Sequence, residues 1–324
     1  MAKALTIPNL RFNTPVSTCL PSIVDARIRE ILSFKKGVLK ESAETVHDMR
    51  VACRRLQTVL IVFAEYIEKG KLRKFKKQLR RLIRRLGAVR QSDVLIEMFS
   101  ACIKTADDKQ KTVKNLLLAR YSTHRKEAAQ KLVKLLAEIE AGKVFEGFYS
   151  AVNVSPANSY KKIVREIDAV FFGHVMPDAL GNLVREFSLG AARAMDQGGS
   201  GEALHEMRIA GKPLRYALEL SEGCFNGGFD GYFQDVKKMI QWLGDVHDID
   251  EAITALFSFR KEIQSYNAAA GAVIEHFPIG FLLEADKELM NARKKLFGKV
   301  NKNLRLWQQE KFLKKFLALL AKTS

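Results

Sequence analysis

Several features that define other classes of protein are missing from this sequence of 324 residues. The four cysteines, Cys19, Cys53, Cys102 and Cys224, are scattered and form no CxxC pair. Neither a disulfide framework nor a zinc finger is therefore indicated. Proline occurs only seven times, which favours long helices. We expect reduced thiols and a cytoplasmic location.

Long apolar runs are also lacking. No stretch reaches the roughly 18 uncharged apolar residues that a membrane-spanning helix needs. The first 20 residues include Arg11, Asn13 and Pro15 and have no continuous apolar centre, so they do not look like a secretory signal. We expect no membrane insertion.

Motifs of metal-dependent or nucleotide chemistry are missing too, since there is no HExxH pattern and no Gly-rich phosphate loop. Histidine and acid are adjacent at His47-Asp48 and at His247-Asp248, with Asp250 nearby, which leaves a metal-dependent phosphohydrolase as one alternative. However, successive residues of a helix point about 100° apart, so His47 and Asp48 are not expected to share a metal ion. We expect no catalytic residues, no metal ligands and no cofactor.

Acidic residues are scarce in one half of the chain. The net charge is +18, and residues 1–150 hold 31 Lys and Arg against 15 Asp and Glu, whereas residues 151–324 hold 23 against 21. This asymmetry indicates an acidic partner. Nucleic acid, an anionic membrane surface and polyphosphate are the candidates.

Two sequence patterns occur twice. Residues 46–56 (VHDMRVACRRL) return 158 positions later at 204–214 (LHEMRIAGKPL). Residues 86–93 (LGAVRQSD) return 157 positions later at 243–250 (LGDVHDID). Self-similarity over this distance indicates two copies of one unit rather than a short-period solenoid.

Both copies of the first pattern have the periodicity of an amphipathic helix. Apolar side chains recur every three or four residues in each copy, as in a packed helix. A second stripe, about 100° around the helix, carries a histidine followed by cations at the same spacing. Ser42 and Ser200 precede the two helices as candidate N-caps.

The densest positive charge lies in residues 71–85, which contain nine Lys or Arg and no acid. Leu72, Phe75, Leu79 and Leu82 form an apolar stripe through this run, so we predict a packed helix rather than a disordered tail. Each pair of like charges four residues apart destabilises the helix of the free protein by a few tenths of a kcal/mol. A bound anion would relieve that repulsion.

The remaining elements are predicted from periodicity and from Gly and Pro positions. We expect a helix over 21–40 that Gly37 interrupts, a motif helix that Lys69-Gly70 ends, and a kink at Pro213. Long helices are expected over 113–141 and over 281–320, the latter broken near Gly298, with a linker over 147–159. Ala119-Arg120 is expected to align with Ala292-Arg293. The domains are expected to be an arm (1–20), a strongly basic first repeat (21–155) and a second repeat (156–324).

These repeated motifs resemble the CHAD family, an α-helical domain named for its histidines. The resemblance lies in His47 with Arg50, Arg54, Arg55 and Leu56, in the echo that begins at His205, and in the two Leu-Gly-x-Val-x-x-x-Asp segments. It spans about residues 15 to 320. It implies an all-α fold of two tandem four-helix-bundle repeats, related by a pseudo-two-fold axis around a basic central groove. It also implies binding of inorganic polyphosphate without catalysis.

Basic side chains of both copies, and of the helices that follow them, are predicted to hold the phosphate chain. They are His47, Arg50, Arg54, Arg55, Arg73, Lys77, Arg80, Arg81, Arg84, Arg120, His205, Arg208, Lys212, Arg215, Lys238 and Arg293. The histidines would bind either as protonated cations or as neutral donors. Association with polyphosphate granules would follow, and no oligomeric state is predicted.

Nucleic-acid binding through the same basic groove remains an alternative, supported by the charge alone. No helix-turn-helix pattern is evident. Aromatic residues are not interleaved with the basic run, because Phe75 lies on the apolar stripe, so few platforms for base stacking are expected. Any nucleic-acid binding is therefore expected to be weak.

Overall fold

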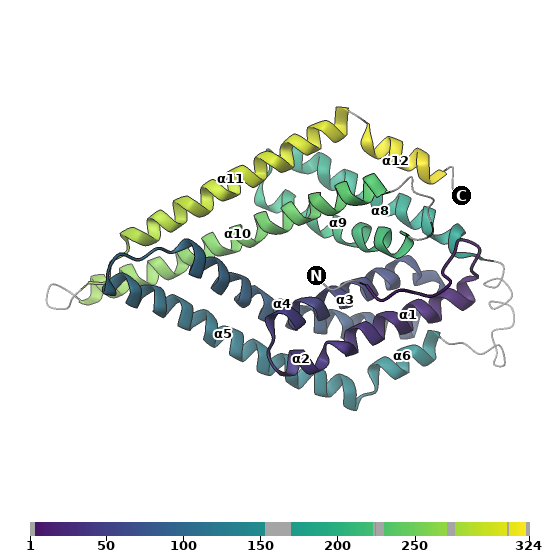
Figure 1. The fold of residues 1–324 in the computed structure, drawn as a ribbon, viewed down its shortest axis with the longest axis horizontal. Helices are drawn as coiled ribbons and strands as arrows, with labels where there is room; N and C mark the ends of the chain where they lie inside the picture. The colour runs from purple at the N-terminus through teal and green to yellow at the C-terminus, as the bar shows by residue number, and fades with distance from the viewer. Residues whose placement is uncertain are drawn as a thin grey trace.

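The computed structural model describes residues 4–152, 170–222, 224, 230–270, 276–309 and 311–321. This part of the chain is all-α, as predicted, and its only strand-like pairing is an isolated bridge between Pro15 and Phe171. The helices of the first half are α1 (Val16–Ser33), α2 (Lys35–Leu39), α3 (Ala43–Val62), the 3-10 helix η1 (Ala64–Tyr66), α4 (Lys69–Cys102), α5 (Asp108–Ala141) and α6 (Val144–Val152). Those of the second half are α8 (Phe172–Asp196), α9 (Gly201–Ser221), α10 (Asp230–Ala270), α11 (Gly280–Gln309) and α12 (Phe312–Ala321) (Figure 1).

Several expected boundaries near the N-terminus are wrong. Helix α1 begins at Val16 inside the expected arm, because Pro15 precedes its first turn and Pro21 is accommodated within it. The break before α2 falls at Phe34, whereas Gly37 lies inside α2. Proline and glycine were thus poor guides to the ends of these helices.

Further along the chain, glycine and proline again fail to mark the ends of helices. The residues expected to end the motif helix, Lys69-Gly70, instead begin α4, because α3 ends at Val62 and η1 follows. Helix α6 contains Gly147, so the first part of the expected linker is helical, while residues 153–159 and the expected domain boundary lie outside the described residues. Helix α11 runs through Gly298, and α9 runs through Pro213.

Both motif helices start where their serine caps predict. The Thr45 backbone N–H donates to Ser42 Oγ at 3.4 Å, and the Ala203 backbone N–H donates to Ser200 Oγ at 3.2 Å. Each bond satisfies one of the backbone donors that a helix start leaves open. The two caps fix the first turns of α3 and α9, and with them the placement of His47 and His205.

The two halves pack their helices in the same order. In the first half α1 packs on α3, α3 on α4 and α4 on α5, and in the second half α8 packs on α9, α9 on α10 and α10 on α11. The halves contact each other through α3 with α9 and through α4 with α10 (Figure 1). The duplicated motif helices therefore lie at the junction, whereas an exact two-fold relation between the halves stays a prediction.

The apolar stripes of both motif helices are buried as predicted. Met49 and Leu56 of α3 and Met207 and Leu214 of α9 are at most 1% exposed, and all belong to one hydrophobic cluster that spans both halves. A second cluster joins the far ends of α4, α5, α10 and α11, around Phe99 and other buried side chains. The junction is thus held by apolar contacts in the main core and at this far end.

One ion pair occurs in equivalent places in the two halves. Arg125 of α5 donates to Asp93 at 2.5 Å, and Arg293 of α11 binds Asp250. Asp93 and Asp250 are the last residues of the two Leu-Gly-x-Val segments. The counterpart of Arg293 is therefore Arg125, and the expected alignment with Arg120 is wrong.

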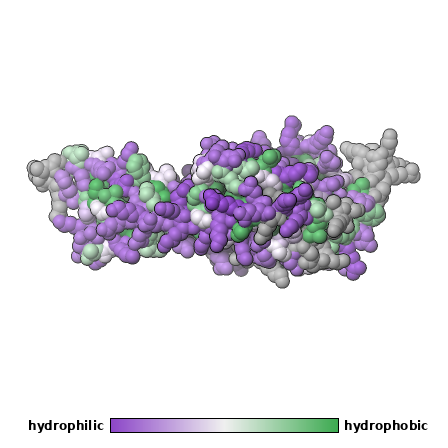
Figure 2. All heavy atoms as spheres, turned by 90° about the horizontal axis from the view of Figure 1, so that it is seen from above, coloured by the Kyte–Doolittle hydropathy of each residue, from purple (hydrophilic) through white to green (hydrophobic). Residues whose placement is uncertain are grey.

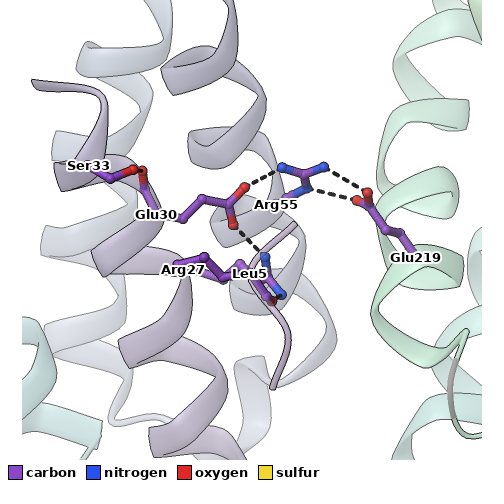
Figure 3. Close-up of polar contacts among 6 residues, drawn as sticks. All are labelled: Leu5, Arg27, Glu30, Ser33, Arg55 and Glu219. Carbon is purple, nitrogen blue, oxygen red and sulfur yellow. Dashed lines mark hydrogen bonds and ion pairs between the residues drawn. The ribbon is translucent and has the colours of Figure 1, made fainter. Parts of the chain in front are cut away.

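A network of four charged side chains links the two halves beside α3 (Figure 3). The Arg55 guanidinium donates to Glu219 of α9 through Nε at 2.9 Å and through Nη2 at 2.7 Å, and it also binds Glu30 of α1. Arg27 pairs with Glu30 at 2.5 Å and donates to the Leu5 carbonyl at 2.8 Å. We call Arg27, Glu30, Arg55 and Glu219 the buried ion network.

The buried ion network corrects one predicted site residue. Arg55 was expected to bind phosphate, yet it is 5% exposed and its donors bind two carboxylates. Neighbouring residues of a helix point in different directions, so Arg55 reaches Glu30 of α1 and Glu219 of α9, whereas Arg54 lies near Arg50 and Arg208. We therefore assign Arg55 to the junction between the halves.

The face of the protein drawn in Figure 2 is mainly hydrophilic. In the view of Figure 2, apolar side chains appear on it only as small separate patches. Among the described helices, none combines the length and the apolarity required to cross a membrane.

Replacing Arg55 by Met should destabilise the protein by about 3 kcal/mol, because Glu219 loses two hydrogen bonds across the junction and the buried Glu30 loses one of its two arginine partners. Urea unfolding followed by circular dichroism measures this. The matched control is Arg29→Met, whose side chain is 71% exposed and pairs with Asp25, and which should change stability by less than about 1 kcal/mol. Equal effects of the two substitutions would show that the buried ion network does not hold the junction.

Candidate functional site

A cavity of about 530 Å³ lies at the junction of the halves, and we call it the central cleft. Its lining residues come from α3 and α4 of the first half and from α9 and α10 of the second. They include six cationic side chains and three carboxylates. The cations are Arg50, Arg84, Arg90, Arg208, Lys212 and Arg215.

The two long walls of the central cleft correspond to each other residue by residue. Each of six lining residues on α4 has a lining counterpart on α10 exactly 157 positions later, the shift of the repeated Leu-Gly segments. The pairs are Arg84 and Gln241, Gly87 and Gly244, Ala88 and Asp245, Arg90 and His247, Gln91 and Asp248, and Val94 and Glu251. Both copies of the duplicated unit therefore contribute the same face to one cavity.

The glycines of these segments lie against the motif arginines. A Cβ atom placed on Gly87 would lie 3.7 Å from Arg50 Nε, and one placed on Gly244 would lie 4.0 Å from Arg208 Nε. The side chain of each motif arginine thus passes over the glycine of its own half. This packing directs Arg50 and Arg208 into the space between the halves.

Four cations of the motif helices are close enough to influence one another strongly. They are Arg50 and Arg54 on α3 and Arg208 and Lys212 on α9. Burial and the charges of the three guanidinium groups lower the pKa of Lys212 to about 6. Burial also lowers the pKa values of Arg54 and Arg208, and in both cases the charge of Arg50 acts in the same direction. The cluster therefore carries more positive charge than its surroundings neutralise.

Two guanidinium nitrogen atoms in this cluster lack an acceptor. Nε of Arg50 and Nε of Arg54 are buried, and neither has a hydrogen-bond partner among the described residues. Arg54 uses Nη1 to donate to Gln57 Oε1 at 2.8 Å, which holds the side chain without neutralising it. Buried donors are normally satisfied, so these two atoms point to an acceptor that the protein does not itself provide.

Carboxylates gather on the α10 wall. Asp245, Asp248 and Glu251 all line the central cleft, and burial raises the pKa of Asp248 although Arg208 and Arg90 oppose the shift. Gln91 of the α4 wall donates to Glu251 Oε2 at 2.5 Å and so connects the two walls. The α4 wall is cationic, whereas the α10 wall is partly acidic.

Three histidines lie in or beside the central cleft: His47 near the start of α3, His205 near the start of α9, and His247 on α10. Burial and the charge of Arg90 lower the pKa of His47, which lines the central cleft. His205 is exposed, and its ring centroid lies 5.2 Å from that of His247, a lining residue. Burial and the charge of Arg208 lower the pKa of His247 to about 4. Both lining imidazoles are therefore neutral at pH 7 in the free protein.

A second hollow of about 900 Å³ follows the outer face of α4, and we call it the basic groove. It is lined by Lys69, Leu72, Arg73, Lys76, Lys77, Arg80, Arg81 and Arg84. Arg84 also lines the central cleft, so the two hollows share a cation. Arg81 has local partners, since it donates to Gln78 at 2.9 Å and to Glu138 at 3.1 Å.

The predicted site residues thus fall into separate groups. His47, Arg50, Arg84, Arg208, Lys212 and Arg215 line the central cleft, and Arg54 belongs to its cation cluster, while Arg73, Lys77, Arg80 and Arg81 line the basic groove. His205 reaches the cleft only through its contact with His247.

Three predicted cations lie in neither hollow. Arg120 pairs with Glu262 at 2.5 Å, Arg293 pairs with Asp250, and Lys238 is an exposed residue of α10. The ion pairs join α5 to α10 and α11 to α10, so these two arginines fix helices rather than face the cleft.

Sequence reasoning missed several lining residues. Arg90, Tyr216 and His247 line the central cleft, as do the carboxylates of the α10 wall. The repeated Leu-Gly segments could have identified Arg90 and His247, because each follows its glycine (Gly87 or Gly244) by three residues, the spacing of one helix face. No cluster of three or more His, Cys, Asp or Glu side chains suited to a metal ion occurs in the described part of the chain.

Comparison with known proteins agrees with this architecture. The CHAD domain family profile matches residues 22–256, which is well over half of the chain. The crystal structure of the CHAD domain from the plant Ricinus communis has a TM-score of 0.68 and 21% identity, covering 94% of this chain and 95% of that one. PptA from Streptomyces chartreusis has a TM-score of 0.57 and 14% identity, covering 89% and 100%. A search of curated proteins found no match. The chain belongs to the CHAD domain family.

Proposed function

We propose that the central cleft binds inorganic polyphosphate and does not cleave it. The observation that carries this proposal is the pair of buried, unpartnered Nε atoms of Arg50 and Arg54 within a cation cluster from both halves. A buried donor without an acceptor costs about 1–3 kcal/mol, and more when it is charged. An anionic oxygen in the cleft would supply the missing counter-charge, and the two Nε atoms could bind it once their side chains turn toward it.

The chemistry of polyphosphate suits this arrangement. The chain is linear and flexible, and oxygen atoms are its only hydrogen-bonding groups. Guanidinium forks bind phosphate through paired hydrogen bonds, and lysines add mobile point charges. Because Arg84 lines both hollows, a chain held by Arg50 and Arg208 can continue along the basic groove. A protein with this property would accumulate on polyphosphate granules.

Nucleic acid is the alternative occupant. Its bases require aromatic platforms for stacking, and Tyr216 is the one Phe, Tyr or Trp among the residues that line the central cleft. Tyr216 is half-buried and lies beside Arg215, whose guanidinium is 5.6 Å from the ring centroid. We therefore expect polyphosphate to bind more tightly than RNA at the same ionic strength.

Replacing both Arg50 and Arg208 by Gln should weaken polyphosphate binding at least tenfold, measured by calorimetry. The slope of log affinity against log salt should fall by about 0.7 for each lost phosphate contact, by analogy with single-stranded nucleic acids. The control replaces Lys294 and Lys295 by Gln, because both are exposed residues of α11 outside the cleft and the change in net charge is the same.

Three results of that titration would contradict the proposal. They are equal losses in the two double variants, tighter binding of RNA than of polyphosphate, and release of orthophosphate when magnesium is added to the wild-type complex. Retained circular dichroism spectra of both variants show that the comparison concerns binding rather than folding.

Replacing Lys212 by Met should stabilise the free protein and weaken polyphosphate binding. The unfolded chain keeps this lysine protonated up to its ordinary pKa of 10.5, whereas the folded chain releases the proton near pH 6. The penalty on the folded state is therefore complete at pH 6 and below, and it falls as the pH rises from 6 toward 10.5. The stability advantage of the variant should shrink from pH 6 to pH 10 in urea unfolding. An advantage that grows with pH would refute the buried cationic cluster.

A further inference from the structure

The two walls of the central cleft differ in charge at matched positions. Where α4 carries Ala88, Gln91 and Val94, the equivalent positions of α10 carry Asp245, Asp248 and Glu251. The duplicated unit therefore contributes one wall without carboxylates and one wall with three. A cavity that served only to attract anions would not need the acidic wall.

Asp248 is the carboxylate most closely involved with the cation cluster. It is half-buried, lines the central cleft, and interacts electrostatically with Arg208 of α9, Arg90 of α4 and Arg50 of α3. Asp245 lies three residues earlier on α10, and its charge raises the pKa of Asp248. Burial lowers the pKa of Arg208, and among the neighbouring charges that of Asp248 opposes this shift most strongly. In the free protein this carboxylate partly supplies the counter-charge that a phosphate would supply.

Glu251 is engaged differently. Its Oε2 atom accepts from Gln91 across the cleft at 2.5 Å, and Asp245 Oδ1 accepts from Gln241 at 2.8 Å. These two carboxylates thus have hydrogen-bond partners of their own among neutral amides. Asp248 differs from them, because the charges around it include Arg50, Arg90 and Arg208, the arginines that the proposed ligand would bind.

We propose that Asp248 limits the affinity of the central cleft, because its carboxylate competes with phosphate oxygens for Arg50, Arg90 and Arg208. This inference rests on the proposed function. A bound chain must either lie against the α4 wall, away from Asp248, or place its oxygens near a like charge. The acidic wall therefore makes binding reversible and dependent on the protonation of one carboxyl group.

Replacing Asp248 by Asn tests this directly, because the amide keeps the shape and removes the charge. At pH 8 the variant should bind a polyphosphate of defined length at least threefold more tightly than the wild type. Burial raises the pKa of Asp248, and a nearby anion raises it further, so the wild-type carboxyl group becomes neutral as the pH falls. The ratio of the two affinities should therefore narrow between pH 8 and pH 5.

Two further variants serve as controls. Asp245→Asn should also tighten binding, but less, because its carboxylate already accepts from Gln241. Glu284→Gln removes one negative charge from an exposed residue of α11 outside the cleft and should leave the affinity within about 1.5-fold of the wild type at 0.15 M salt, where distant charges are screened.

The possible outcomes separate this inference from the proposed function. If the wild type binds polyphosphate but Asp248→Asn binds no more tightly, or gains by a factor independent of pH, the competition is refuted and the binding site stands. If Glu284→Gln gains as much as Asp248→Asn, the effect is one of net charge and the inference is again refuted. If the wild type does not bind polyphosphate at all, the proposed function itself fails.

Discussion

The contact between α3 and α9 is the constraint on which the rest of the structure depends, because it brings basic side chains of both halves close together. Arg50 and Arg54 from one half face Arg208 and Lys212 from the other, and burial removes much of the water that would screen them. That repulsion must be offset by the rest of the junction. The shared hydrophobic core provides most of the attraction, and the buried ion network beside α3 adds a balanced set of two arginines and two glutamates. Positive charge in the cleft is only partly compensated by the carboxylates of the α10 wall, whereas the neighbouring network is neutral.

Duplication explains how such a site is built and why its walls differ. The repeated segments place corresponding helix faces on opposite sides of a single cavity, so a cationic stripe that recurs in both halves becomes a cluster at the junction. At the cleft, corresponding positions of the two walls differ in their side chains. Arg84 corresponds to Gln241 and Gln91 to Asp248, which concentrates positive charge on α4 and moderates it on α10. In the proposed function, a phosphate chain would be drawn to the α4 wall and would continue toward the basic groove.

The sequence predicted the all-α fold, the buried stripes and the serine caps, because these depend on local periodicity and on residues next to a helix start. It also placed Arg50, Arg208 and Lys212 on stripes that recur in both copies, and all three line the central cleft, while their role in binding stays a prediction. Arg55 was grouped with Arg54 because the two are adjacent in the sequence, although adjacent side chains of a helix point in different directions and Arg55 binds Glu30. Arg120 pairs with Glu262, a residue so distant in the sequence that the motif gave no sign of it. The acidic wall could not be foreseen, because the repeated motif shows which positions correspond but not which of them face the cavity.

The most direct test observes the arginine side chains of both halves during binding. In a nuclear magnetic resonance titration of protein labelled with nitrogen-15 at arginine Nε, polyphosphate of defined length should shift the Nε–H signals of Arg50, Arg54 and Arg208 together. The signal of Arg55, held by Glu30 and Glu219, should stay in place. If only exposed residues of the basic groove such as Arg73 and Arg80 respond while Arg50 and Arg208 remain unchanged, the central cleft is not the binding site.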